Sequence, residues 1–225
     1  MSQADTSPLV SVIMAAYNAE DYLHEALESV FAQQWQPFEV IVVDDGSVDR
    51  TAEIAKSFAA VHYVHQESAG AAAARNTAAA LARGSFVANF DADDLLPPTR
   101  LSVQANHLIE HPDVGCVLGR QEWINAPSSL PRDTVYGDVD GIPLSSAMFR
   151  REVLAALGGY DTAFAVGEDT DVLIRMRERG IEYTVLPDIV LYRRYHEGSL
   201  SSSRDPHSQL IRSLRAKLER GKQSS

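Results

Sequence analysis

The alternation of apolar runs with helix-like stretches over residues 9–90 restricts the fold more than any other feature of this chain. Runs typical of buried strands lie at 9–15, 38–43, 61–65 and 85–90, and stretches with helical spacing lie between them at about 19–33, 49–60 and 70–82. This order predicts a mainly parallel sheet with right-handed crossovers and helices on its faces. Because ligands bind at the carboxyl ends of the strands in such a sheet, we expect the functional residues to gather there.

Length and composition agree with one such domain. The chain has 225 residues, of which 45% are hydrophobic and 23% charged, as in ordinary globular proteins. Cys116 is the only cysteine, and neither a signal peptide nor an apolar run long enough to span a bilayer is recognisable, so we expect a soluble, cytoplasmic protein. The net charge of −11 argues against a nucleic-acid partner. Because so acidic a protein repels anions, an anionic substrate would need a bound cation to offset the repulsion.

Three carboxylates follow the fourth apolar run, because Asp91, Asp93 and Asp94 lie within the motif DADD. Neighbouring like charges repel each other unless a cation relieves the repulsion. Hard oxygen ligands on a short tether suit Mg²⁺ or Mn²⁺, which keep coordination positions open for substrate phosphates. The alternative is a solvated acidic turn, since D-x-D triplets are common in loops.

Polar residues also follow the first two strands, at 15–18 and 44–49. Ser47 or Asp49 could simply cap the helix that follows, so this cluster alone is ambiguous. A second strand ending in paired acids, Asp44 and Asp45, makes a shared site at one sheet edge the better interpretation. No G-x-G-x-x-G turn follows the first strand, and the three lysines are not placed for a P-loop or a phospho-receiver domain.

The ordered set of motifs resembles glycosyltransferase family 2, whose members have the GT-A fold and use nucleotide-diphospho-sugars. The resemblance is carried by VSVIMAAYN at 10–18, VIVVDDGSVDRT at 40–51, GAAAARN at 70–76, NFDADD at 89–94, LGGYD at 157–161 and GEDTD at 167–171. Together these segments span about residues 9–200. The resemblance implies a single GT-A, Rossmann-like α/β domain with a mainly parallel central sheet flanked by helices.

The family's residue roles can be carried over position by position. The implied substrate-binding residues are Ala15, Tyr17, Asp45, Arg75, Asp91, Asp94 and Glu168, and the implied metal ligands are Asp93, Asp91 and His196. Tyr17 would pack on the nucleobase, Asp45 would accept a base N–H, and Arg75 would approach the base or the phosphates. Asp93 would bind the metal directly, whereas Asp91 would also contact the ribose and Asp94 the donor sugar. Asp44 would be structural.

Two of these roles have local alternatives. Asp169 would be the general base, although acids in the first turn of a helix are also stabilised by the helix dipole. Asp171 lies about 200° around that helix from Asp169, so the two cannot share one task. His196 would complete the metal site, and Mn²⁺ accepts a nitrogen ligand more readily than Mg²⁺ does. A histidine of this kind could instead be an ordinary structural residue.

We divide the chain into a glycosyltransferase domain at 1–203 and a basic tail at 204–225. The nucleotide-sugar half is expected at about 9–112 and the acceptor half at about 113–203, with a loop at 125–141 near the acceptor. In the tail, Leu210, Leu214 and Leu218 form one stripe among arginines. Such a helix could contact an anionic membrane at its inner face, dock on the acidic body, or pair with a second copy in a homodimer.

The interpretation we adopt is a metal-dependent, inverting transfer of a sugar from a UDP-linked donor to an acceptor hydroxyl, whose identity the sequence does not reveal. One alternative is a sugar-1-phosphate nucleotidyltransferase, which would normally carry a glycine-rich, arginine-containing loop after the first strand. The other is a catalytically silent module that binds nucleotide-sugars. An intact Asp169 weighs against the silent module.

Overall fold

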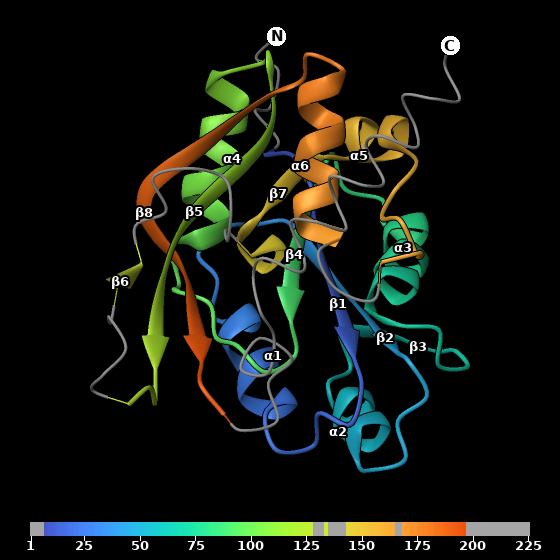
Figure 1. The fold of residues 1–225 in the computed structure, drawn as a ribbon. Coiled ribbons are helices and arrows are strands. Elements are labelled where there is room, and N and C mark those ends of the chain that lie inside the picture. The colour runs from blue at the N-terminus through green and yellow to red at the C-terminus, as the bar shows by residue number, and fades with distance from the viewer. Residues whose placement is uncertain (1–6, 128–132, 135–142, 165–167, 197–225) are drawn as a thin grey trace, which may run out of the picture.

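A twisted sheet runs through the middle of the computed structural model, which describes residues 7–127, 133–134, 143–164 and 168–196 (Figure 1). Its strands are β1 (Val10–Ala16), β2 (Phe38–Asp44), β3 (Val61–His65), β4 (Phe86–Asp91), β5 (Val114–Ile124), β6 (Asp133–Thr134), β7 (Met148–Arg150) and β8 (Glu182–Arg194). They pair in the order β3-β2-β1-β4-β7-β5-β6, and β8 pairs with β5. The first four strands are parallel to one another, as are β5 and β8. The predicted α/β class is therefore confirmed.

Helices cover both faces of this sheet. The helices are α1 (Leu23–Phe31), α2 (Thr51–Ser57), α3 (Ala71–Leu81), α4 (Arg100–Glu110), α5 (Arg151–Leu157) and α6 (Glu168–Glu178), with a 3₁₀ turn η1 (Leu144–Ser146). Buried side chains of α1, α2 and α4 share one core with one face of the sheet, and those of α3, α5 and α6 share a second core with the opposite face.

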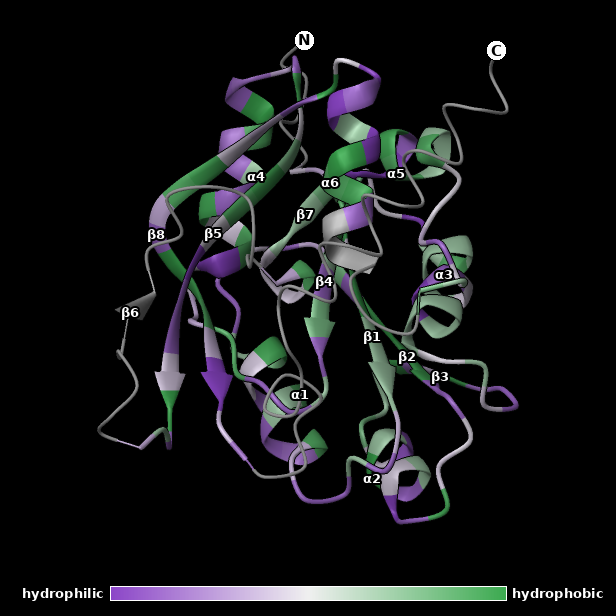
Figure 2. Cartoon of the chain, viewed as in Figure 1, coloured by the Kyte–Doolittle hydropathy of each residue, from purple (hydrophilic) through white to green (hydrophobic). Residues whose placement is uncertain are grey.

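The strand sequences explain why two cores form. Successive side chains of a strand point to opposite faces, so a strand covered on both sides needs an almost continuous apolar run. In β1, Val12 and Met14 belong to the first core, whereas Ile13 belongs to the second. Figure 2 shows hydrophobic colour along β1 and β2 and hydrophilic colour at the arrowhead of β8. In β8, polar residues therefore replace apolar ones at the carboxyl end of the strand.

Several predicted element boundaries need correction. The helix expected from residue 19 begins only at Leu23, because the backbone at 19–22 forms a turn in which Ala19 O accepts the N–H groups of Tyr22 and Leu23. The strand expected at 182–186 continues to Arg194, since β8 pairs along the whole of β5. Within the loop expected at 125–141, the two residues of β6 pair with β5. The central strand β7 is antiparallel to both of its neighbours.

The tail at 204–225 lies outside the described residues. None of the helices in the described part combines the length and the apolar character that crossing a membrane requires.

Candidate active site

Three carboxylates meet at the carboxyl end of β4. Oxygens of Asp91, Asp93 and Asp94 all lie within 4.8 Å of one another. Asp91 is the last residue of β4 and pairs in register with Ala15 of β1, so Ala15 borders the cluster, and its contact with substrate stays a prediction. Asp91 and Asp93 remain partly exposed, whereas Asp94 is 3% exposed. Two accessible carboxylates above a buried one are a suitable oxygen donor set for Mn²⁺ or Mg²⁺.

Arg75 of α3 forms an ion pair with the cluster. Its Nη2 donates a hydrogen bond of 2.8 Å to Asp91 Oδ1, and the residue is buried. Burial by itself would raise the pKa of the Asp91 carboxyl, but the charge and hydrogen bond of Arg75, with the charge of Arg193, hold that pKa below its ordinary value. Asp91 is therefore an anion at neutral pH and can serve as a metal ligand.

Asp94 behaves in the opposite way. Burial, together with the charges of Asp93 and Asp91, raises its pKa well above the ordinary value. Its Oδ1 accepts the backbone N–H of Arg194 at 2.9 Å, which ties the acidic loop to the end of β8. Asp94 can therefore carry a proton at a pH where Asp91 does not. A protonated carboxyl can donate a hydrogen bond to a sugar hydroxyl as well as accept one.

The structure brings His196 to this cluster from a position more than 100 residues away in the sequence. Its Nε2 lies 2.9 Å from Asp93 Oδ2, and its side chain is 19% exposed. The ring also contacts Tyr22, with 4.8 Å between the ring centroids. The position at the cluster agrees with the predicted set of metal ligands, and coordination itself stays a prediction.

Asp45 has a structural role that its sequence position did not indicate. Its carboxylate accepts hydrogen bonds from the backbone N–H groups of Ala69 (2.9 Å) and Gly70 (2.8 Å), from the Gln66 amide (2.7 Å) and from the Ser68 hydroxyl (3.3 Å). This arrangement fixes the segment that leads into α3 and thereby positions Arg75. The contact of Asp45 with a nucleobase stays a prediction, and that contact would have to form in addition to these hydrogen bonds.

Asp44 is structural, as expected. Its two oxygens accept the N–H of Ser47 at 2.8 Å and the hydroxyl of Tyr63 at 2.7 Å. Burial, followed by the hydrogen bond and the charge of Asp44, raises the pKa of Tyr63 to about 12. The Tyr63 hydroxyl therefore keeps its proton at neutral pH and donates a hydrogen bond to Asp44.

The loops after β1 and β2 bind each other. Asn18 N donates to Ser47 Oγ at 2.9 Å, and Ala19 N donates to Thr51 Oγ1 at 2.8 Å. The carboxylate of Asp49 accepts the N–H groups of Thr51 and Glu20. The N-cap of α2 is Arg50, so neither Ser47 nor Asp49 is the N-cap residue that the capping alternative expected. The Asp49 side chain instead links the loop that presents Tyr17 to the start of α2. Tyr17 is 59% exposed, as an aromatic surface that receives a ligand would be.

Arg100 was missed by the sequence analysis. It is fully buried beneath the acidic loop and donates to the carbonyl oxygen of Asn89 at 2.6 Å and to Gln104 Oε1 at 3.1 Å. Burial lowers its pKa to about 9, and the charges of Asp91 and Asp94 act against that shift. In the sequence, only its position shortly after the DADD motif sets Arg100 apart. An arginine at such a position is more often exposed on the surface.

The backbone of Glu168 and Asp169 forms the first turn of α6, and their side chains lie outside the described part of the structure. Their roles as substrate contact and general base therefore stay predictions. Asp171 is fully buried and accepts a hydrogen bond from Arg175 Nε at 2.7 Å. Asp171 therefore has a structural contact, and its difference in function from Asp169 stays a prediction.

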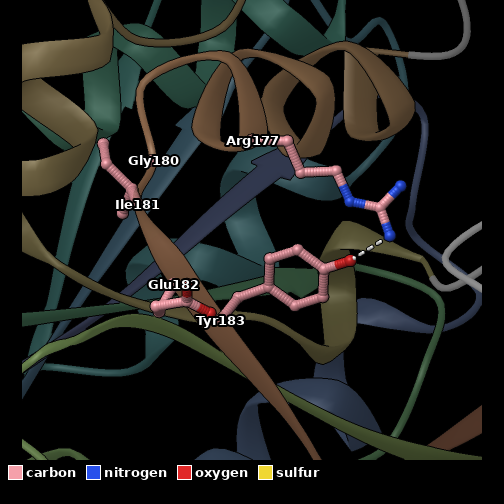
Figure 3. A pocket seen from close by; sticks show the side chains of 5 residues that line it. All are labelled: Arg177, Gly180, Ile181, Glu182 and Tyr183. Atoms are coloured by element: carbon pink, nitrogen blue, oxygen red, sulfur yellow. Dashed lines mark hydrogen bonds between the residues drawn. The ribbon is translucent and has the colours of Figure 1, made fainter.

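A separate hollow of about 380 Å³ lies where α6 meets β8 and is lined by Arg177, Gly180, Ile181, Glu182 and Tyr183 (Figure 3). Arg177 donates to the Tyr183 hydroxyl at 2.7 Å across it. Because β8 begins here and runs parallel to β5, this hollow lies at the amino ends of these strands, away from the acidic cluster. It contributes no residue to the candidate site.

Comparisons with known proteins agree with the fold and with the family that the sequence motifs resemble. The family model described as glycosyl transferase family 2 matches residues 11–165. YibD from Escherichia coli (strain K12), an uncharacterized glycosyltransferase, is 44% identical over 94 residues, which are 40% of this chain and 27% of YibD.

Two solved structures share the fold. S. aureus TarS in complex with UDP-GlcNAc has a TM-score of 0.73 and 24% identity, over 87% of this chain and 61% of that one. The mannosyltransferase PcManGT from Pyrobaculum calidifontis, in complex with GDP-Man and Mn²⁺, has a TM-score of 0.72 and 25% identity, over 96% of this chain and 65% of that one. In all three comparisons the chain spans less than two thirds of the other protein.

Proposed function

The chain belongs to glycosyl transferase family 2, and on this premise we propose that it transfers a sugar from a UDP-linked donor to an acceptor hydroxyl with the help of Mn²⁺ or Mg²⁺. The observation that carries this proposal is the cluster of Asp91, Asp93 and Asp94, whose oxygens lie within 4.8 Å of one another, with His196 against Asp93. The complex of PcManGT with GDP-Man and Mn²⁺ supports this proposal, because that protein shares the fold and binds a nucleotide-sugar together with a divalent ion.

Asp93, Asp91 and His196 are the residues that would hold the ion. A divalent ion held by these residues would supply positive charge for the diphosphate leaving group, which gains negative charge in the transition state. Arg75 lies behind Asp91 and can add a second positive charge toward the phosphates. Tyr17 would stack on the base, and Asp94 would contact the donor sugar. In this proposal residues 9–112 bind the donor and residues 113–203 bind the acceptor.

Asp169 completes the proposed mechanism as the general base. It takes the proton of the acceptor hydroxyl while that oxygen attacks the anomeric carbon and the bond to the diphosphate breaks. A single in-line displacement inverts the configuration at this carbon. The backbone position of Asp169 in the first turn of α6 supports this role because the helix dipole favours the carboxylate form.

The proposal can be tested with a panel of UDP-sugars and GDP-sugars, measured by thermal shift and by calorimetry with Mn²⁺ or with EDTA. We expect one donor class to bind tightly only with the ion, and Asp93→Ala to remove the dependence on the ion and weaken donor binding. Asp113→Ala, which changes an exposed acid just before β5, is the matched control and should behave like the wild type. Equal donor affinity with EDTA and with Mn²⁺ would refute the metal-dependent mechanism.

Hydrolysis of the bound donor, or transfer to an added acceptor, separates an enzyme from a silent binding module. We expect slow metal-dependent release of UDP from the donor even without an acceptor. Donor binding without any turnover would favour the silent module.

A further inference from the structure

Arg194, the last residue of β8, connects three elements around the acidic cluster. Its Nη2 forms an ion pair with Glu25 Oε2 of α1 at 2.7 Å, and its Nε donates to the carbonyl oxygen of Asp93 at 2.9 Å. Its backbone N–H donates to Asp94 Oδ1. The side chain is only 11% exposed, so these contacts hold the guanidinium in one place.

Tyr22, directly before α1, lies against both Arg194 and His196. The Arg194 guanidinium carbon is 5.2 Å from the centroid of the Tyr22 ring, within the range of a cation–π contact. The His196 ring centroid is 4.8 Å from the same ring. One tyrosine ring therefore contacts both the last residue of β8 and a residue two positions beyond the strand.

His196 needs such a support because it lies beyond the end of β8. The last backbone pair between β8 and the acidic loop joins Tyr192 to Leu95, and Tyr195 N still donates to Ile124 O. At His196 itself, the ring contacts Asp93 and Tyr22. If the imidazole nitrogen binds an ion instead of Asp93, Tyr22 becomes the contact that keeps the ring from rotating away. Ordering a free side chain costs entropy, which a preordered ring does not lose on binding.

We propose that Tyr22, Glu25 and Arg194 form a clasp that positions His196 for metal binding, an inference that rests on the proposed metal-dependent function. In this proposal the clasp residues bind neither the donor nor the ion directly. They act through His196 and through the loop of Asp93 and Asp94. Groups of this kind around a metal site are typically worth about 10- to 100-fold in metal affinity.

The three clasp residues should not contribute equally. Glu25 is 61% exposed, and ion pairs of exposed groups contribute little. Tyr22 is partly buried and contacts His196 directly, so most of the effect should depend on its ring. The hydroxyl is not needed for ring contact, and Tyr22→Phe should preserve the clasp.

The test measures Mn²⁺ affinity of the whole protein, with and without UDP, from the signal of free Mn²⁺ in electron paramagnetic resonance. We expect affinity to fall by about 10- to 100-fold for Tyr22→Ala and for Tyr22→Leu, which keeps an apolar side chain at this position. Tyr22→Phe should stay within about twofold, and Glu25→Gln should lose at most a few-fold. Glu28→Gln is the matched control, since Glu28 lies on the same helix, is 62% exposed and pairs with His24 instead.

A mutant cycle with His196→Ala distinguishes positioning from a general structural effect. If the clasp acts through His196, Tyr22→Ala should no longer change Mn²⁺ affinity once His196 is replaced. An equal loss in both backgrounds would overturn the positioning role. Wild-type affinity in Tyr22→Ala and Tyr22→Leu would overturn the clasp while leaving the proposed function intact, whereas a wild-type protein that binds no Mn²⁺ would refute the metal-dependent function and the clasp together.

Discussion

Replacement of Gly159 by alanine is the perturbation whose effect the structure defines most sharply. Gly158 and Gly159 follow α5, and both have positive φ, at +81° and +75°. A Cβ at Gly158 would have no atom within 4 Å, whereas a Cβ at Gly159 would lie 2.4 Å from Asn76 Oδ1. The two substitutions therefore share the backbone strain and differ only in the steric clash.

Asn76 cannot easily move aside. Its Oδ1 accepts the N–H of Tyr160 and its Nδ2 donates to the Tyr160 carbonyl, both at 2.8 Å. The Tyr160 hydroxyl in turn donates to Asn89 Oδ1 of β4 at 2.8 Å. Rotation of the Asn76 amide away from an added methyl group would break two hydrogen bonds that join α3 to the segment after α5.

We expect Gly158→Ala to lower the free energy of unfolding by about 1–2 kcal/mol, the cost of a left-handed conformation for an L-residue. Gly159→Ala should lose about 1 kcal/mol more for each of the two broken hydrogen bonds, or about 3–4 kcal/mol in total. Urea unfolding followed by circular dichroism, with a common m-value, measures both.

The double variant Gly159→Ala with Asn76→Ala provides the internal check. Without the Asn76 amide there is no clash, so in the Asn76→Ala background Gly159→Ala should cost only the strain of about 1–2 kcal/mol. If both glycine variants lose the same stability, or if the background makes no difference, the steric reasoning is wrong.

Three further predictions concern the site and the pH dependence of stability. Tyr17→Ala should leave thermal stability nearly unchanged, because Tyr17 is 59% exposed. In calorimetry it should weaken UDP binding by about 5- to 150-fold, the contribution of one base stacked on an aromatic ring. Unchanged affinity would show that Tyr17 does not line the base pocket. Asp169→Asn should keep donor affinity within a few-fold and lower turnover by about 10²- to 10⁴-fold, whereas a parallel loss of donor binding would place Asp169 in the donor site. Burial raises the pKa of Glu39, but hydrogen bonds from Ser11 and Arg83 outweigh it and hold that pKa below its ordinary value of 4.5. A carboxylate with a depressed pKa stabilises the fold above pH 4.5 and loses this contribution as the pH falls through its folded pKa. Glu39→Gln should therefore lower the free energy of unfolding in urea by about 1–3 kcal/mol at pH 7, and this loss should shrink below pH 4.5. A loss that stays constant with pH would contradict the depressed pKa of Glu39.

The sequence was sufficient to predict the layered fold and the edge of the sheet at which the acidic cluster lies. Apolar runs of strand length separated by amphipathic stretches allow few arrangements, and parallel strands bring their carboxyl ends to one edge. For this reason the residues after β1, β2 and β4 could be expected together, and the register of Ala15 with Asp91 confirms it. The structure also brings His196 to Asp93, as the family resemblance implied.

The tertiary structure alone decided which partner each polar side chain has. Asp45 accepts the N–H groups that lead into α3, Arg100 is buried beneath the acidic loop, and Tyr22 contacts His196 across 174 positions of sequence. Periodicity reports the spacing of neighbours along one element, so it predicts the face on which a side chain lies. The atoms that this face meets depend on how helices and loops pack across the sheet, and a buried polar group takes whichever partner that packing brings within hydrogen-bonding distance.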